Sequence, residues 1–302
     1  MPELTKRYRQ HKTQQTRKVK QNSVVCSPAR NDAAGSYTCY STNALKSLKT
    51  AWNTRRPDAP IDSDEPTDIW KSLYKRMSNT CDTEKCWLRH KFLTSGIDNE
   101  TLQYTFAPEA PSSWSKNPNE WLSNVDIAQV MSHFEYMHKS FAFIGPSPID
   151  FDKRFQHGEC VWNELCAFDI KDFLKRGKSK IGIVFNTDPH DKAGEHWISM
   201  FIDVSAQKPF VFFFDSSGDP PVLEVSKFSE KVLQQAKNLE IVMEYHENHP
   251  FEHQKGNTEC GMYSIYMISK ILRGEKTPIS FKKERITDEE MTRMRREFFN
   301  IS

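Results

Sequence analysis

The residue best placed for covalent chemistry is a cysteine at the start of an apolar helical pattern. Cys260 is followed by Gly261, and Gly274 would end the helix. The residues spaced on one face of this helix are Met262, Ile265, Tyr266, Ser269 and Leu272. A thiol in the first turn of a helix lies at the positive end of the helix dipole, where free N–H groups favour an anion. Cys260 can therefore be a nucleophile, although taken alone it also fits a buried, unreactive cysteine.

His196, Asp215 and Gln254, all upstream of Cys260, have the side chains that a thiol nucleophile requires as partners. His196 opens a strand-like segment, 196–204, and Asp215 ends the apolar run of the next, 209–217. If these strands are neighbours, their ends place the imidazole, as general base, beside an orienting carboxylate. Gln254 can donate a side-chain N–H to an oxyanion, and the backbone N–H of Cys260 can donate a second. The pattern predicts acyl transfer through a cysteine nucleophile.

The elements that must position these residues alternate between helix and strand. Helical spacing is found at 121–137, around 168–177 and at 222–239. Strand-like runs are found at 180–186, 196–204, 209–217 and 240–246. The helix that begins at or near Cys260 is expected to be the last element.

The first part of the chain has a different character. Residues 1–25 form a basic arm with almost no apolar residues, which is typical of disorder. The arm is either a solvated tail or a weak contact for nucleic acid or another polyanion. Residues 26–115 are expected to form a small module, with helices at 42–53 and 68–79 and a loop at 56–66 between them. The proline-rich strap 107–118 would connect it to the domain 116–302.

The cysteines and the hydropathy pattern exclude several classes of protein. The chain has 302 residues and seven cysteines, an odd and scattered set that favours a reducing compartment over a disulfide framework. The longest apolar clusters are strand-sized, so no membrane contact is expected, and the start of the chain lacks the apolar region of a secretory signal. These features predict an intracellular protein.

The combination of motifs resembles a known group of cysteine peptidases. The motifs are His196–Trp197, Asp215, Gln254 and Cys260–Gly261, together with WLSNVDI at 121–127. They resemble the peptidases that process ubiquitin-like modifiers such as SUMO, and the related adenovirus protease. Asn124 stands where that family usually has an acidic residue. The resemblance implies an α+β fold, a papain-like, circularly rearranged core in which helices flank a central mixed sheet.

A narrower resemblance includes the N-terminal module. Segment 181–197, the stretch TCYSTNALKSL and segment 81–88 resemble the proteases of large nucleocytoplasmic DNA viruses, of the African swine fever virus type. The cellular SUMO proteases lack such a module, and the resemblance runs from about residue 37 to 302. Some viral relatives have asparagine as the third catalytic residue, where this chain has Asp215.

The resemblance implies a role for each site residue. Cys260 would attack the scissile carbonyl, His196 would transfer the proton, and Asp215 would orient the imidazole. Gln254 would stabilise the oxyanion. Trp197 would line a narrow substrate tunnel, or simply pack in the core, and Gly261 would leave the nucleophile turn uncrowded. The implied activity is that of a thiol endopeptidase that cuts after Gly-Gly-Xaa-like sites and matures viral structural or core polyproteins, in the virion and host cytoplasm.

Other functions remain open from the sequence. The same tunnel would accept the tail of SUMO or ubiquitin, which makes a deconjugating isopeptidase the second interpretation. A non-catalytic virion or nucleic-acid-binding protein is the third, supported by the basic arm alone. Acetyltransferases share the residue order, but no acyl-CoA site is visible. The module is expected to extend the substrate groove, so that deleting residues 1–115 would cost more activity than stability.

No cofactor and no metal is expected. The histidines His246, His249 and His253, and the cysteine pairs Cys81/Cys86 and Cys160/Cys166, lack the spacing of common metal sites. Asn186 and Asp188 follow a strand beside the predicted site and could support the loop that precedes His196.

Overall fold

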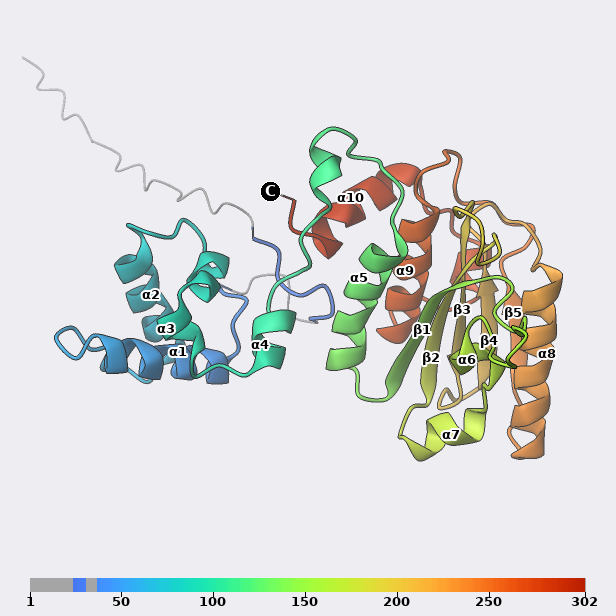
Figure 1. Cartoon of the computed structure of the whole chain (residues 1–302), viewed down its shortest axis with the longest axis horizontal. Coiled ribbons are helices and arrows are strands. Elements are labelled where there is room, and N and C mark those ends of the chain that lie inside the picture. Colours follow the sequence, from blue (N-terminus) through green and yellow to red (C-terminus); the bar gives the residue numbers. More distant parts are fainter. Residues whose placement is uncertain (1–23, 31–36, 302) are drawn as a thin grey trace, which may run out of the picture.

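The chain forms two bodies in a computed structural model that describes residues 24–30 and 37–301 (Figure 1). The basic arm lies almost entirely outside the described residues. The smaller body contains α1 (Thr42–Arg55), α2 (Pro66–Met77), the 3-10 helix η1 (Glu84–Arg89), α3 (Lys91–Thr94) and α4 (Asn99–Tyr104). It has its own apolar core, to which α1 and α2 contribute Leu48, Trp52, Ile69 and Leu73. The helices predicted at 42–53 and 68–79 are confirmed as α1 and α2. The domain boundaries given above stay predictions.

The larger body is built on a mixed sheet. Its strands are β1 (Phe141–Pro148), β2 (Lys180–Asn186), β3 (Trp197–Asp203), β4 (Phe210–Phe214) and β5 (Glu244–Glu247), in that spatial order. The outer pairs β1–β2 and β4–β5 are parallel, whereas β2–β3 and β3–β4 are antiparallel. The expected α+β fold with a central mixed sheet is confirmed.

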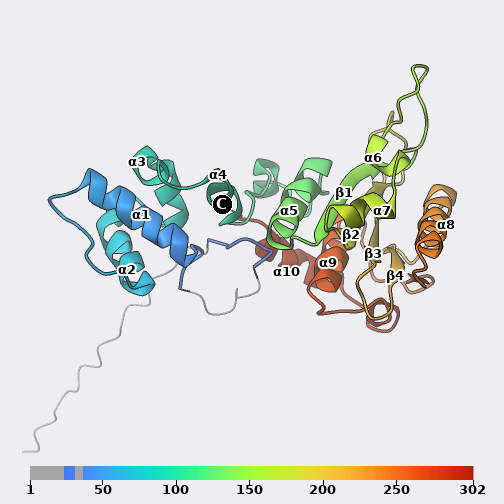
Figure 2. The same cartoon turned by 90° about the horizontal axis from the view of Figure 1, so that it is seen from below.

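Helices cover both faces of this sheet (Figures 1 and 2). The helices and 3-10 helices are η2 (Ser112–Ser115), α5 (Asn124–Met137), α6 (Asn163–Cys166), α7 (Ile170–Lys175), α8 (Leu223–Asn238), α9 (Cys260–Leu272), η3 (Ser280–Lys282) and α10 (Asp288–Phe298). One core joins α5, α9 and α10 to the sheet through Phe201 and Phe212. The second joins α7 and α8 to the opposite face through Met200 and Phe213. The side chains of β3 and β4 therefore point alternately into the two cores, because successive residues of a strand face opposite sides of the sheet.

Three elements differ from the sequence prediction. The strand β1 precedes the segment expected to be the first strand, and its glycine and prolines, in GPSP, conceal a strand pattern. The last strand begins at Glu244, later than expected, because Glu240 has a positive φ and the chain extends only beyond it. The helix at Cys260 is not the last: α10 follows, with Thr287 accepting a hydrogen bond from the Glu290 N–H as its N-cap.

The expectation of free thiols was wrong for six of the seven cysteines. They form the disulfides Cys26–Cys39, Cys81–Cys86 and Cys160–Cys166. Each pair is close in the sequence, with separations of 13, 5 and 6 residues, so each is a local cross-link. In the part of the chain described, no helix is long and apolar enough to cross a membrane.

Two segments connect the bodies, and both are anchored in the larger one. In the first, residues 24–30, Ala29 belongs to the core of α5, α9 and α10, and Arg273 at the end of α9 donates to the Pro28 carbonyl. In the second, the strap, Ala110 N–H donates to the Asn300 carbonyl over 2.9 Å. The segments also bond to each other, from Ala107 N–H to the Val25 carbonyl over 3.0 Å. The module, which is the smaller body, is therefore joined to the larger one by a two-stranded connection.

The packing of α9 on the sheet depends on a residue without a side chain. A Cβ added at Gly182 of β2 would lie 2.9 Å from both Ile268 Cγ2 and Phe141 Cζ. We predict that Gly182→Ala lowers the free energy of unfolding by about 1–3 kcal/mol, because the core would be overpacked. Urea denaturation measures this. Gly96→Ala is the control, since no atom lies within 4 Å of its added Cβ; equal stability of the two variants would contradict the prediction.

Candidate active site

Cys260 lies where the first turn of α9 meets the sheet. It is the first residue of the helix, as expected, and its side chain is buried. It is the free cysteine that remains when the three disulfides are formed. The first N–H groups of a helix have no partner within the helix, so the Cys260 N–H is a donor at the head of α9.

The register of the sheet brings His196 and Asp215 to the same end of the neighbouring strands β3 and β4. Ser199 of β3 is opposite Phe214 of β4, so the residue before β3 and the residue after β4 lie at the same end of the sheet. His196 Nε2 lies 2.8 Å from Asp215 Oδ1. With Nε2 engaged, Nδ1 is the nitrogen left to face a nucleophile, and the Cys260 side chain also hydrogen-bonds to this histidine.

The charge state of His196 follows from these contacts. Burial lowers the pKa of His196, but the hydrogen bonds to Asp215 and Cys260, and the charges of both groups, outweigh it and raise the pKa to about 10. The imidazole is therefore protonated at neutral pH and can donate a proton to a group bound beside it.

A residue that the sequence analysis missed fixes Asp215. Asn248 is completely buried and bonds to both sides of the Asp215 backbone: its Oδ1 accepts from the N–H over 2.9 Å, and its Nδ2 donates to the carbonyl over 2.7 Å. Ser217 N–H donates to the same Asp215 oxygen that bonds to His196. A lone asparagine after a strand carries no pattern in the sequence, so no signal pointed to Asn248.

Gln254 is buried next to the segment that follows Asp215. Its Oε1 accepts from the Ser216 hydroxyl over 2.8 Å, and its Nε2 donates to the Gly256 carbonyl over 2.9 Å. These bonds fix the amide orientation, because the oxygen must face a hydroxyl donor and the nitrogen a carbonyl. A primary amide has two N–H donors, so a second remains for an anion.

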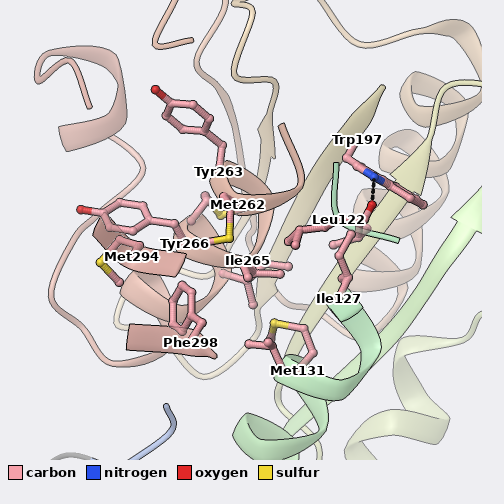
Figure 3. Close-up of a cluster of buried hydrophobic side chains, with 14 of the residues drawn as sticks. Leu122, Ile127, Met131, Trp197, Met262, Tyr263, Ile265, Tyr266, Met294 and Phe298 are labelled. Carbon is pink, nitrogen blue, oxygen red and sulfur yellow. Dashed lines mark hydrogen bonds between the residues drawn. The ribbon is translucent and has the colours of Figure 1, made fainter. Parts of the chain in front are cut away.

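Trp197 and Gly261 are in contact. The indole N–H of Trp197 donates to the Leu122 carbonyl over 2.9 Å, which fixes the turn before α5 (Figure 3). A Cβ on Gly261 would lie 3.0 Å from Leu122 Cβ and 3.2 Å from Trp197 Cδ1. The residue after Cys260 is thus a glycine because the Trp197 ring and Leu122 already occupy the space beside it.

A cavity of about 850 Å³ begins at Trp197. Its walls are the strap, the segment 120–126, the end of β1, the segment 161–162 and the loop before His196. Trp121, with an exposed ring, and Asn124 both line it. Ser123 and Asp126 form the capping box that starts α5, so Asp126, which also lines the cavity, is bonded to the backbone of this helix start. Of the site residues named above, Trp197 lines this cavity.

The loop before His196 is fixed by the two residues expected to support it. Asn186 Oδ1 accepts from the Asp188 N–H over 2.9 Å and from the Glu195 N–H over 3.2 Å. Asp188 accepts from the Gly194 N–H over 3.2 Å. The Thr187 N–H donates to the His196 carbonyl, so the loop closes at the base of the histidine.

The three histidines considered as metal ligands have separate partners. His246 pairs with Glu244, His249 bonds to the Gly218 carbonyl, and His253 bonds to the Phe281 carbonyl. Among the described residues, Cys81, Cys86 and His90 lie close together, but the two sulfurs are bonded to each other and so are not thiolate ligands. None of these residues belongs to the His196 site.

Comparison with known proteins decides the family. Residues 149–301 match the model of the Ulp1 protease family, C-terminal catalytic domain. The chain belongs to the Ulp1 protease family. It is therefore a cysteine peptidase, and the non-catalytic interpretation is set aside. His196, Asp215, Gln254 and Cys260 all lie within the matched residues.

The chain is also similar to proteases of two large DNA viruses. It is 28% identical over 273 residues to a putative thiol protease of Acanthamoeba polyphaga mimivirus, covering 83% of this chain and 85% of the relative. It is 28% identical over 248 residues to the SUMO-1 cysteine protease S273R of African swine fever virus, covering 78% and 89%. The crystal structure of the African swine fever virus pS273R protease has the same fold, with a TM-score of 0.64, 24% identity and coverage of 93% and 97%. The resemblance to this viral type is confirmed.

The raised pKa of His196 gives a pH dependence with a definite sign. Because the pKa of about 10 lies above the ordinary 6.5, the proton binds more tightly in the folded state. Its contribution to stability is complete below pH 6.5 and is lost as the pH rises towards 10. We predict that Asp215→Asn moves the alkaline limb of the kcat/KM profile to lower pH, because the imidazolium loses its anionic partner.

The control for this prediction is a buried aspartate at the far end of β3, the strand that His196 precedes. Asp203 pairs with Lys180 and does not contact the site. Asp203→Asn should leave the alkaline limb where it is in the wild type. Identical limbs in Asp215→Asn and the wild type would show that Asp215 does not set the protonation of His196.

The close contact at Gly261 gives a second prediction. In Gly261→Ala the new methyl group must displace Leu122 or Trp197, since both lie within 3.3 Å of it. We expect kcat/KM to fall on the order of 10- to 100-fold, the loss that a misplacement of about 1 Å causes. Peptide hydrolysis and thermal unfolding are measured together with Gly96→Ala. An active Gly261→Ala enzyme would mean that the contact does not shape the site.

Proposed function

We propose that the protein is a thiol endopeptidase that cuts after small, glycine-containing sites, Gly-Gly-Xaa-like, in a viral structural or core polyprotein. The observation that carries this proposal is the extent of the viral relationship. The matches to the two viral proteases run over 273 and 248 residues, well beyond the catalytic segment 149–301. They therefore include much of the N-terminal part, which a catalytic domain alone does not have.

In the proposed mechanism, each residue acts as its position allows. The Cys260 thiolate attacks the carbonyl carbon of the scissile bond, and the C–N bond breaks as the His196 imidazolium gives its proton to the leaving amine. Water then adds to the thioester, with His196 as the base, and the acid product leaves. Asp215 orients the imidazole. The Cys260 N–H and the second Nε2 hydrogen of Gln254 donate to the oxyanion.

The proposed preference for glycine follows from the crowding around the nucleophile. Trp197 and Leu122 leave no room for a Cβ on Gly261, and Trp197 and Trp121 both line the adjoining cavity. A substrate strand that passes Trp197 to reach Cys260 is best tolerated when its last residues have no side chain. Pro111 and Ser113 of the strap line the same cavity, which supports a contribution of the strap to the substrate groove.

The competing function is removal of a ubiquitin-like modifier, as the name of the African swine fever virus relative, SUMO-1 cysteine protease, suggests. Both reactions would use the same catalytic residues, and a diglycine tail would pass Trp197 to reach Cys260 as the Gly-Gly-Xaa peptide would. For the place of action we propose the virion and the host cytoplasm, on the basis of the viral relatives. The proposed contact of the basic arm with nucleic acid falls on residues outside those described.

The deciding experiment compares the wild type with Cys260→Ala on two kinds of substrate. We expect the wild type to cleave Gly-Gly-Xaa peptides and Cys260→Ala to cleave none, because the nucleophile is absent. Reporters fused to SUMO or ubiquitin form the second substrate set. Cleavage of the fusions alone would favour the deconjugase, and peptide cleavage by Cys260→Ala would refute the assigned nucleophile.

A further inference from the structure

The residue before the nucleophile carries a buried charge. Glu259, the N-cap of α9, forms a two-pronged ion pair with Arg295 of α10: Nε lies 2.9 Å from Oε2, and the second guanidinium nitrogen, Nη2, lies 3.0 Å from Oε1. The side chains are only 2% exposed for Arg295 and 4% for Glu259. The fold therefore removes two opposite charges from water directly beside Cys260.

The strap covers this ion pair. The guanidinium carbon of Arg295 lies 4.5 Å from the centre of the Trp114 ring, and Trp114 belongs to η2 in the strap. Trp114 also packs against Phe299, which directly follows α10. The backbone on either side is fixed, since Asn300 exchanges hydrogen bonds with Pro108 and Ala110. A continuous chain of contacts thus runs from the strap through Arg295 and Glu259 to the nucleophile.

Stability alone does not explain a pair of this kind. Replacing a buried ion pair by apolar residues is often neutral or stabilising, because the pair must repay its desolvation. The position of the ion pair, directly beside Cys260, is more informative than its contribution to stability. Glu259 makes no side-chain cap bond to α9, whereas the carboxylate of an aspartate at an N-cap commonly bonds to the first N–H groups of its helix. Arg295 turns the carboxylate away from those donors.

The orientation of Glu259 matters for the charge at Cys260. A carboxylate directed at the start of α9 would compete for the N–H groups that the oxyanion needs, and its negative charge would oppose the thiolate. Held by Arg295, the charge is neutralised and the helix start stays free. The shielding ring of Trp114 keeps water from the pair, which strengthens the attraction.

We propose that Arg295 and Trp114 are positioning residues for Cys260, acting through Glu259, so that the strap controls turnover at the nucleophile as well as lining the substrate cavity. This inference rests on the proposed function, because it assumes that Cys260 is the nucleophile. It predicts a loss of kcat with little change of KM when the contact between Trp114 and Arg295 is removed.

Point variants test this in the full chain. Deleting residues 1–115 is unsuitable, because Ala29 and Trp114 belong to the core of the catalytic body and the deletion would expose it. The key variant is Trp114→Ala, and Trp114→Phe is the conservative variant that keeps a ring over Arg295. Trp52→Ala is the matched control, since Trp52 is also a buried tryptophan beside an arginine, Arg76, but lies in the core of the module.

Two rates are measured on each variant. One is kcat for a Gly-Gly-Xaa peptide, with KM alongside. The other is alkylation of Cys260 by iodoacetamide, followed on the peptide that contains it. For Trp114→Ala we expect both kcat and the alkylation rate to fall on the order of 10- to 100-fold, the effect of a reacting group displaced by about 1 Å. Trp114→Phe should recover most of the loss, and Trp52→Ala should keep both rates.

A double variant separates positioning from stability. Glu259→Gln alone leaves Arg295 as an unpaired buried charge and can fail to fold. Combining Glu259→Gln with Arg295→Met removes both charges, so the thermal unfolding midpoint should return towards the wild type. We expect kcat to stay low, because a glutamine amide oxygen without its arginine partner can still accept from the N–H groups at the start of α9. Recovery of both the midpoint and kcat would mean that the Glu259–Arg295 pair serves only packing, and would overturn the proposal.

The remaining outcomes are also decisive. Unchanged kcat and alkylation in a folded Trp114→Ala protein, or an equal loss in Trp52→Ala, would overturn the positioning role. A wild type that cuts no peptide would count against the proposed function. The alkylation rates would still decide the positioning of Cys260 in that case, because they need no substrate.

Discussion

The site depends on the hydrogen bond between His196 and Asp215, and this bond constrains the rest of the catalytic body. These two residues, 19 positions apart, meet at 2.8 Å because β3 and β4 are antiparallel neighbours, so that β3 starts and β4 ends at the same end of the sheet. The sheet is mixed because β1 pairs in parallel with β2, and β5 with β4, outside these antiparallel strands. The first turn of α9 must then lie at that same end of the sheet, and the packing of α9 over Gly182 and Phe201 allows it to do so.

The same constraint explains why polar groups are buried so densely at one end of the sheet. Asn248, Ser216 and Gln254 are all buried, and each is bonded to a neighbour in the segments after β4 and β5. A buried polar group costs free energy unless it is bonded, so these side chains have few alternative orientations. The rigidity of the imidazole partner thus comes from amide and hydroxyl contacts rather than from apolar packing.

The sequence predicted the meeting of His196 and Asp215 better than the contacts that support it. Their places at the start of one strand-like segment and at the end of the next were enough to put them at one end of the sheet. The catalytic roles of these two residues, and of Gln254 and Cys260, stay predictions. Local patterns cannot reveal contacts that depend on the final fold, such as Asn248 with Asp215 or Arg295 with Glu259, which are 33 and 36 residues apart. The strand β1 was missed because glycine and proline obscured its pattern, and α10 because its capping signals were not used. The cysteine pairs were missed because an odd, scattered set has no spacing rule.

The two-stranded connection between the bodies also determines how the module can come apart from the rest. The chain enters the module from a segment anchored by Ala29 and Arg273 and leaves it through a strap anchored at Asn300. In topological terms the module is an insertion whose two ends meet at its base. A single backbone cut in the exposed loop between α1 and α2 therefore leaves both pieces attached to the catalytic body. Releasing the whole module would take a cut in each connecting segment, and a cut between Cys26 and Cys39 would still be bridged by their disulfide.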